Sequence, residues 1–174
     1  MPRNIELKAR LADLQAAQSA ARALGIELRG VEKQRDTYFK VGEGRLKLRQ
    51  RWIEDDRVDS QLIFYRRANE SAAKGSDYTL IAIADGEGLR AILGAALGVL
   101  VEVTKRRVVY LYDNVRIHLD EVDRLGCFLE FEAIVDATCD DARAHDKVAR
   151  LQMHFALRAD QLLRGSYSDL LLAL

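Results

Sequence analysis

Basic side chains recur at every second position in one stretch of this sequence. In the segment RLKLRQR, Arg45, Lys47, Arg49 and Arg51 alternate with leucine or glutamine. Successive side chains of a β-strand point to opposite faces, so these cations would share one face of a strand. Arginine and lysine side chains that converge from several strands suit phosphate oxygens, which they bind by charge-assisted and bidentate contacts. The pattern therefore indicates a site for phosphate groups.

The same alternation occurs in other segments, where it brings in carboxylates. The residues that would share such faces are Asn4, Glu6 and Lys8 in RNIELKAR, Lys105 and Arg107 in TKRRVVY, Arg116, His118 and Asp120 in VRIHLDEV, and Glu130 and Glu132 in CFLEFEAIV. LIFYRR adds Arg66 or Arg67, and alternation alone does not decide between them. Carboxylates suit hard divalent cations, Mg²⁺ or Mn²⁺, which phosphate chains bring with them. Metals and bases together on an oligophosphate are the minimal machinery for phosphoryl or nucleotidyl transfer.

The ordinary interpretation of each strand is a half-buried one with its polar face in water. Two features favour an inward charged face instead. Bases dominate the polar faces of some strands and carboxylates those of others, and the apolar faces are regular enough to be covered by helices. Burying isolated charges costs on the order of several kcal/mol each, so a charged interior would need a highly charged, wet ligand.

The composition predicts a single globular domain over residues 1–174. Apolar residues make up 49% and charged residues 31%, and the 27 basic and 27 acidic side chains cancel. This balance gives no bulk attraction to nucleic acid or to an anionic membrane, so we expect neither as a partner. The longest apolar run, Ala91 to Val101, is about half a bilayer-spanning helix. Because charge begins at Arg3 and no signal-peptide pattern is present, we expect a cytoplasmic protein.

The elements that must position these side chains follow from periodicity and turn signals. Helices are expected at 11–24, 85–97 and 140–157, with a short one at 169–174. Strands are expected at 3–10, 35–41, 45–53, 58–67, 76–83, 101–112, 114–122 and 126–135. VGEGR (Val41 to Arg45) and YDNVR (Tyr112 to Arg116) resemble hairpin turns. These elements predict an α+β fold whose antiparallel, strongly curved sheet could close into a barrel with helices outside.

Four features together resemble the CYTH superfamily, also called triphosphate tunnel metalloenzymes. They are NIELK at the start, DTYF followed by RLKLR, KRR before a tyrosine, and HLDEVDRLGCFLEFE from His118 to Glu132. SYSDLL, Ser166 to Leu171, is similar to the family's closing motif. The resemblance implies a closed eight-stranded antiparallel β tunnel with helices packed outside. It also implies the activities found in the family, which are those of class IV adenylate cyclases, thiamine triphosphatases and inorganic triphosphatases.

The resemblance implies a role for each matching residue. The ligands of Mg²⁺ or Mn²⁺ would be Glu6, Glu130 and Glu132, with Asp120 nearby. The triphosphate clamp would be Lys8, Lys47, Arg49, Lys105 and Arg107, with Arg67 preferred over Arg66 in its strand. The catalytic members of this clamp would be Lys8, Lys105 and Arg107, and the supporting residues would be Asn4, Asp36, Tyr38 and His118.

One position departs from the family signature, which is Glu-x-Glu-x-Lys. This chain has Asn4-Ile5-Glu6-Leu7-Lys8 at the corresponding positions. An amide can coordinate a cation through its oxygen, but it contributes no charge. A site with one fewer negative charge should hold a second metal more weakly.

Two reactions of a triphosphate stay open, and cyclisation of ATP is the leading prediction. In this reaction the ribose 3′-hydroxyl attacks the α-phosphorus and pyrophosphate leaves. The motif SDY (Ser76 to Tyr78) and the short chain resemble bacterial class IV cyclases, which favours this reaction. In the alternative, water attacks the terminal phosphorus of inorganic, thiamine or nucleoside triphosphate. A non-catalytic oligophosphate binder is a further alternative, and a homodimer stays open. An RNA-binding sheet and a lipocalin-like carrier fit less well, because carboxylates repel phosphates and a carrier needs an apolar interior.

Overall fold

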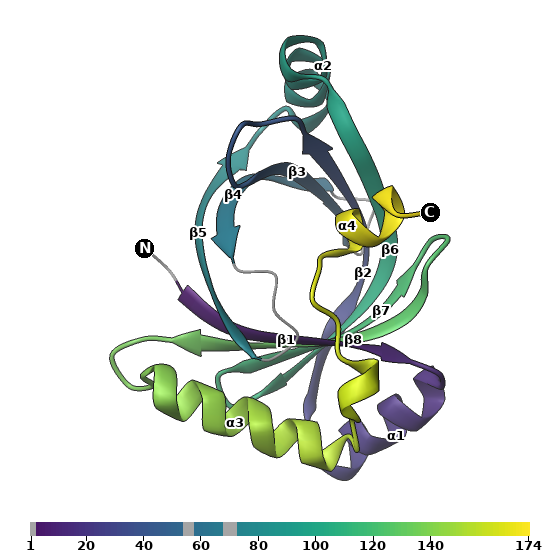
Figure 1. Ribbon diagram of the computed structural model, residues 1–174, viewed down its shortest axis with the longest axis vertical. Coiled ribbons are helices and arrows are strands. Elements are labelled where there is room, and N and C mark those ends of the chain that lie inside the picture. The colour runs from purple at the N-terminus through teal and green to yellow at the C-terminus, as the bar shows by residue number, and fades with distance from the viewer. Residues whose placement is uncertain (1–2, 54–57, 68–72) are drawn as a thin grey trace.

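The computed structural model describes residues 3–53, 58–67 and 73–174, and the side chains of Arg67 and Lys74 lie outside this description. The strands are β1 (Arg3–Leu11), β2 (Glu27–Phe39), β3 (Arg45–Trp52), β4 (Val58–Arg67), β5 (Lys74–Ile83), β6 (Val99–Tyr112), β7 (Val115–Val122) and β8 (Gly126–Val135). The helices are α1 (Leu14–Ala23), α2 (Gly86–Leu97), α3 (Asp141–His154), the 3₁₀ turn η2 (Ala159–Gln161) and α4 (Tyr167–Leu172). Figure 1 shows them in a view down the barrel.

The described strands form one closed antiparallel barrel in the order β1-β5-β4-β3-β2-β6-β7-β8. This confirms the predicted α+β fold with a closed eight-stranded sheet. Residues 41–45 form a bend that joins β2 to β3, and residues 112–116 form a tight turn that joins β6 to β7. Both are hairpin connections, as their sequences indicated. Asp113 in the second turn has a φ of 54°, a left-handed conformation that Asp tolerates better than most residues.

The register of the barrel places charged residues opposite one another on its inner face. Glu6 of β1 lies opposite Glu132 of β8, and Lys8 lies opposite Glu130. A one-residue slip would move each of these side chains to the outer face, so the alternation of the two strands fixes the pairing. Sequence alternation predicted the faces, and the closed sheet decides which strands are neighbours.

The main hydrophobic core lies outside the barrel, between the sheet and two helices. The outward residues of β1, β7 and β8 pack beneath α1 and α3, with Ile117 and Phe131 fully buried against Val148 of α3. Figure 1 shows both helices on the same side of the barrel, below β1 and β8. Because this face of the three strands is apolar and covered, their charged face must point into the barrel.

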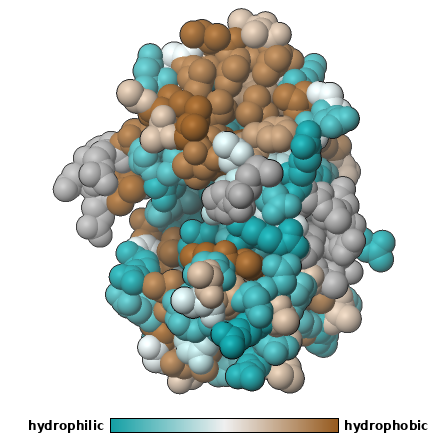
Figure 2. All heavy atoms as spheres, turned by 90° about the vertical axis from the view of Figure 1, so that its left-hand side faces the viewer, coloured by the Kyte–Doolittle hydropathy of each residue, from teal (hydrophilic) through white to brown (hydrophobic). Residues whose placement is uncertain are grey.

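Helix α2 does not cover the sheet in the expected way. It lies at the opposite end of the molecule from α1 and α3 (Figure 1), and Gly86 is its one buried residue. Exposed apolar side chains in this region include Ile81 of β5 together with Ile92 and Leu97 of α2. Figure 2 shows apolar surface gathered at this end of the molecule. The expectation that three helices cover the apolar faces therefore holds for α1 and α3 only.

A second, smaller core lies on the inner side of the barrel wall, where α4 packs. Tyr167 and Leu171 of α4 contact the inward residues Val103 of β6 and Phe128 of β8. Ser166 caps this helix by accepting from the backbone N–H of Asp169, so α4 begins at Tyr167 and not at the expected 169. The early start brings the Tyr167 ring to the inner wall.

Several other element boundaries differ from those expected, and the starts of α1 and β2 differ most. Helix α1 begins at Leu14 and not at 11, because β1 continues to Leu11 and the Asp13 carboxylate caps the backbone N–H groups of the first turn. Strand β2 begins at Glu27, eight residues before the expected start at 35, in a stretch with little clean alternation. Pairing with β6 imposes the strand there, and a register shift near Gly30 accommodates it.

Within the described residues, no helix has the length and apolar composition that crossing a bilayer would require.

Candidate active site

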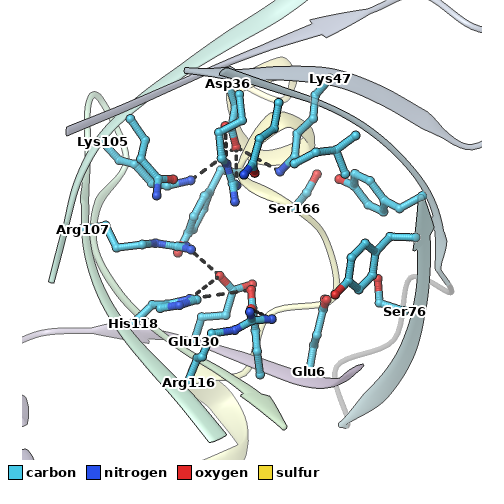
Figure 3. A pocket seen from close by; sticks show the side chains of 18 of the residues that line it. Glu6, Asp36, Lys47, Ser76, Lys105, Arg107, Arg116, His118, Glu130 and Ser166 are labelled. Carbon is cyan, nitrogen blue, oxygen red and sulfur yellow. Dashed lines mark hydrogen bonds and ion pairs between the residues drawn. The ribbon is translucent and has the colours of Figure 1, made fainter. Parts of the chain in front are cut away.

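The barrel encloses a polar cavity of about 320 Å³, lined by inward side chains of all eight strands and by Ser166 and Tyr167 (Figure 3). Most of the residues singled out from the sequence line it: Asn4, Glu6, Lys8, Asp36, Tyr38, Lys47, Arg49, Lys105, Arg107, His118, Glu130 and Glu132. The side chain of Arg67 lies outside the described residues. Asp120 is fully buried and is not part of the cavity wall.

A cluster of three cations surrounds Asp36 on one side of the cavity. Arg49 donates to both carboxylate oxygens at 2.8 Å, and the Nζ of Lys47 lies 3.0 Å from Oδ2. The Nζ of Lys105 lies 3.4 Å from the same oxygen. Burial alone would raise the pKa of Asp36, but Arg49, Lys105 and Lys47 together hold it well below its usual range. One carboxylate thus faces three cations, which leaves local positive charge.

Lys105 is the least compensated member of this cluster. Its side chain is 2% exposed, and its nearest carboxylate is shared with two other cations. Burial lowers the pKa of Lys105, Asp36 opposes this, and Arg107 and Arg49 lower it further, to about 7. The ammonium group is therefore poised to lose or gain a proton near neutral pH.

A cluster of acids lies across the cavity from Asp36. Glu130 accepts from the Nζ of Lys8 at 2.7 Å and from Nη2 of Arg107 at 2.8 Å. Glu132 forms an ion pair of 3.0 Å with Arg116. Burial would raise the pKa of Glu130, but Lys8 and Arg107 hold it well below its usual range. Burial would also raise the pKa of Glu132, but His118 and Arg116 lower it to about 2. Both acids are therefore ionised at neutral pH.

His118 lies beside these two acids. Its Nδ1 is 3.7 Å from one oxygen of Glu130 and 3.7 Å from one oxygen of Glu132. Burial, followed by the charge of Arg107, lowers the pKa of His118. The possible ligand atoms of His118, Glu130 and Glu132 all lie within 4.8 Å of one another, close enough to hold one cation.

Asp120 holds Arg107 in place from behind. Its two oxygens accept from Nε and Nη2 of Arg107 at 2.7 and 2.6 Å, and Oδ2 also accepts from the Tyr167 hydroxyl at 2.8 Å. Burial would raise the pKa of Asp120, but Arg107 lowers it well below its usual range. These bonds occupy both oxygens of the carboxylate, so Asp120 orients Arg107 in this structure. The role of Asp120 at a metal site stays a prediction.

Several residues of the wall were given no role from the sequence, and Tyr167 and Arg116 are two of them that contact predicted site residues. The ring of Tyr167 lies 3.7 Å from the Nζ of Lys8 and 5.3 Å from that of Lys105, a cation–π arrangement. Its motif, SYSDLL, was noted, but nothing in the strand alternation shows that this segment enters the barrel. Arg116 aligned with the charged face of its strand, and its partner Glu132 became apparent only from the register of β7 and β8.

The amide of Asn4 lies at the edge of the acid cluster. In the orientation that its neighbours require, Oδ1 accepts from Nη2 of Arg116 at 3.2 Å and the amide nitrogen donates to the Arg3 carbonyl oxygen at 3.1 Å. The side chain is buried and lines the cavity, as the alternation predicted.

Comparison of the sequence with known families agrees with this architecture. The sequence profile of the CYTH domain matches residues 2–167. The chain belongs to the CYTH domain family. The match spans all eight strands of the barrel and reaches Tyr167 of α4. No curated protein sequence matches this CYTH protein.

Solved structures share the fold at low sequence identity. The PH1012 protein from Pyrococcus horikoshii OT3 has a TM-score of 0.82 and 22% identity, over 96% of this chain and 98% of that one. A candidate adenylate cyclase from Vibrio parahaemolyticus has a TM-score of 0.75 and 20% identity, over 97% of each chain. HpAC1 from Hippeastrum, described with a dominant triphosphatase activity, has a TM-score of 0.60 and 16% identity, over 90% and 89%. At these identities the likeness shows the fold of the CYTH tunnel.

Proposed function

We propose that this CYTH protein is a metal-dependent enzyme that binds the triphosphate of its substrate in the tunnel and converts ATP to cyclic AMP and pyrophosphate. The observation that carries the triphosphate proposal is the cluster around Asp36. Lys47, Arg49 and Lys105 line the cavity and share this one carboxylate. Oligophosphate oxygens would supply the negative charge that the cluster lacks, through charge-assisted hydrogen bonds.

The acid cluster supports a divalent cation in the same cavity. Glu6 and Glu132 lie directly opposite each other on the inner face of β1 and β8, and like charges in this position destabilise a sheet. Carboxylate oxygens are ligands that Mg²⁺ and Mn²⁺ prefer, so Glu6, Glu130 and Glu132 fit such an ion. Held there, it would supply Lewis-acid charge to the phosphate oxygens.

Lys8 and Arg107 would link the two halves of the site. In the protein alone both donate to Glu130, and Arg107 is held rigidly by Asp120. A cation on Glu130 would compete with them for its oxygens, and phosphate oxygens would offer them new acceptors. Lys8 and Arg107 would then orient the phosphate chain and stabilise the charge that develops as the bond to the leaving group breaks.

One sector of the wall favours a nucleotide over inorganic triphosphate. The described side chains of β4 and β5 that line the cavity are neutral: Gln61, Ile63, Tyr65, Ser76, Tyr78 and Leu80. Asp59, on the same face near the start of β4, is not part of this lining and pairs with Arg51. A wall of apolar and aromatic groups with a few polar ones suits a base and a ribose better than a phosphate chain. In the proposed reaction the ribose 3′-oxygen attacks the α-phosphorus, its proton is lost to solvent, and pyrophosphate leaves.

Hydrolysis of a triphosphate is the second candidate. It would use the same clamp, with water as the nucleophile and the terminal phosphorus as the centre attacked. HpAC1 from Hippeastrum, which shares the fold, is described with a dominant triphosphatase activity, and this supports the alternative.

Product analysis with purified protein separates these reactions. ATP and inorganic triphosphate would each be incubated with Mg²⁺ and with Mn²⁺, and the products separated by ion-exchange chromatography. Cyclic AMP with pyrophosphate supports the cyclase, whereas orthophosphate from inorganic triphosphate supports the hydrolase. Absence of turnover with both substrates, despite tight binding of triphosphate, would exclude both enzymes and leave an oligophosphate-binding protein.

Two variants test whether the tunnel is the site. Lys105→Ala should weaken triphosphate binding, because it removes a cation from the phosphate cluster. Glu130→Ala should alter the metal dependence, because it removes a proposed ligand. Lys33→Ala, on the exposed outer face of β2, is the matched control and should behave as the wild type. Wild-type behaviour of both tunnel variants would remove the tunnel-site proposal.

A further inference from the structure

The imidazole of His118 has a buried nitrogen that its surroundings leave without a hydrogen bond. The residue is 4% exposed and lines the cavity. Among the described residues, no partner lies within hydrogen-bonding distance of Nδ1. Buried polar atoms in native proteins nearly always have a partner, so this nitrogen requires an explanation.

Its position relative to the two acids supplies one. Nδ1 is 3.7 Å from Oε2 of Glu130 and 3.7 Å from Oε1 of Glu132, too far for a hydrogen bond to either. Two atoms that each bind one metal ion at roughly 2.0–2.2 Å lie about 3–4 Å apart. The spacing therefore suits a shared cation better than a direct contact.

We propose that His118 binds the divalent metal through Nδ1, together with Glu130 and Glu132, and so makes this tunnel prefer Mn²⁺ over Mg²⁺. The inference rests on the proposed function for the presence of a metal, and it adds the ligand set and its selectivity. Imidazole nitrogen suits first-row transition metals, whereas Mg²⁺ is usually bound by oxygen ligands alone. A site of one nitrogen and two carboxylates should thus discriminate between these ions.

The fold holds the three residues in a fixed arrangement. His118 lies directly opposite Glu130 in the pairing of β7 with β8, so their separation is set by the sheet. Oε2 of Glu130 also accepts from Arg107 at 2.8 Å, and the metal must share this oxygen or displace the guanidinium. Tripolyphosphate, which would offer Arg107 another acceptor, should therefore strengthen metal binding.

The test is direct observation of the bound metal by pulsed electron paramagnetic resonance. Mn²⁺ would be added to wild-type protein with tripolyphosphate, in unlabelled protein and in protein labelled with ¹⁵N only at histidine. We expect a nitrogen modulation that changes from ¹⁴N to ¹⁵N on labelling. In His118→Asn, whose amide offers oxygen in place of nitrogen, the modulation should vanish and the preference for Mn²⁺ over Mg²⁺ should fall about tenfold or more.

The controls separate this inference from the proposed function. His145→Asn, on an exposed position of α3, should keep both the modulation and the preference. Bound Mn²⁺ that depends on Glu130 but shows no histidine modulation would overturn the inference while leaving the proposed metal site standing. Absence of Mn²⁺ binding in wild-type protein with tripolyphosphate would overturn both. The labelling experiment needs no variant, so it decides the question even if His118→Asn does not fold.

Discussion

Binding of an oligophosphate should draw a proton from solution at neutral and mildly alkaline pH, and Lys105 should be its destination. In the protein alone burial and the cations Arg107 and Arg49 lower the pKa of Lys105 to about 7. A phosphate chain beside Nζ would add negative charge at close range and raise the pKa towards its ordinary value of 10.5. Ligand binding and protonation are then linked.

The sign and size follow from this shift. Below pH 7 Lys105 is already charged, so its contribution to affinity does not change with pH. Above pH 7 it must gain a proton to bind, and at pH 8 the uptake should be about 0.9 proton per ligand. Affinity should then fall about tenfold for each further pH unit, until the pH approaches the pKa in the complex.

Calorimetry in buffers of different ionisation enthalpy measures this uptake. Tripolyphosphate would be titrated at pH 8 with saturating Mg²⁺, and the observed heat plotted against the ionisation enthalpy of the buffer. Protons carried by the ligand itself are the same in every variant. Lys105→Met should therefore lower the slope by about 0.9 proton, and Lys33→Met on the outer face of β2 should not change it. Equal slopes for wild type and Lys105→Met would refute the assignment of the proton to Lys105.

Three further substitutions probe the same network. Asp36→Asn removes the carboxylate that Arg49, Lys47 and Lys105 share, so chemical denaturation should show a free energy of unfolding lower by about 3–5 kcal/mol. Tripolyphosphate should then raise the thermal midpoint of this variant more than that of the wild type. A variant whose thermal midpoint does not change when tripolyphosphate is added would contradict this. Tyr167→Phe keeps the ring over Lys8 but removes one donor to buried Asp120, and a denaturant titration should show a cost of about 1–3 kcal/mol. Asn4→Glu should tighten Mn²⁺ binding measured by calorimetry, because the side chain at this position lines the cavity next to the acid cluster. Equal or weaker binding would show that the new carboxylate pairs with Arg116 and not with the metal.

The sequence predicted the inner face of the barrel because strand alternation has only two outcomes. Because one face of each strand is apolar and was expected to pack outside the barrel, the charged face had to point inward. The cavity lining agrees with this at Glu6, Lys47 and Arg107. The fold class and most element boundaries followed from the same signal. Strand β2 was expected too short, since its first residues are ordered by pairing with β6 and not by their own pattern.

Contacts between segments far apart in the chain could not be predicted from the sequence. Lys105 and Asp36 are 69 positions apart, and only closure of the barrel makes β2 and β6 neighbours. Asp120 shares the charged face of its strand, and the structure adds that its carboxylate accepts hydrogen bonds from Arg107 and Tyr167. Alternation predicts the side of the sheet on which a residue lies, and it cannot distinguish a carboxylate that faces the cavity from one that lies behind a guanidinium.

Asn4 shows how the structure changes the argument about the number of metals. An amide in place of the family's carboxylate removes one negative charge from β1, and Arg116 adds a positive charge at the same place, because it contacts both Asn4 and Glu132. The Asn4 side of the acid cluster is thus neutralised by the protein itself. On the other side His118 brings a neutral nitrogen towards Glu130 and Glu132. If the tunnel binds metal as proposed, this asymmetry predicts one cation beside His118 and not a symmetrical pair, because Arg116 already balances charge on the Asn4 side.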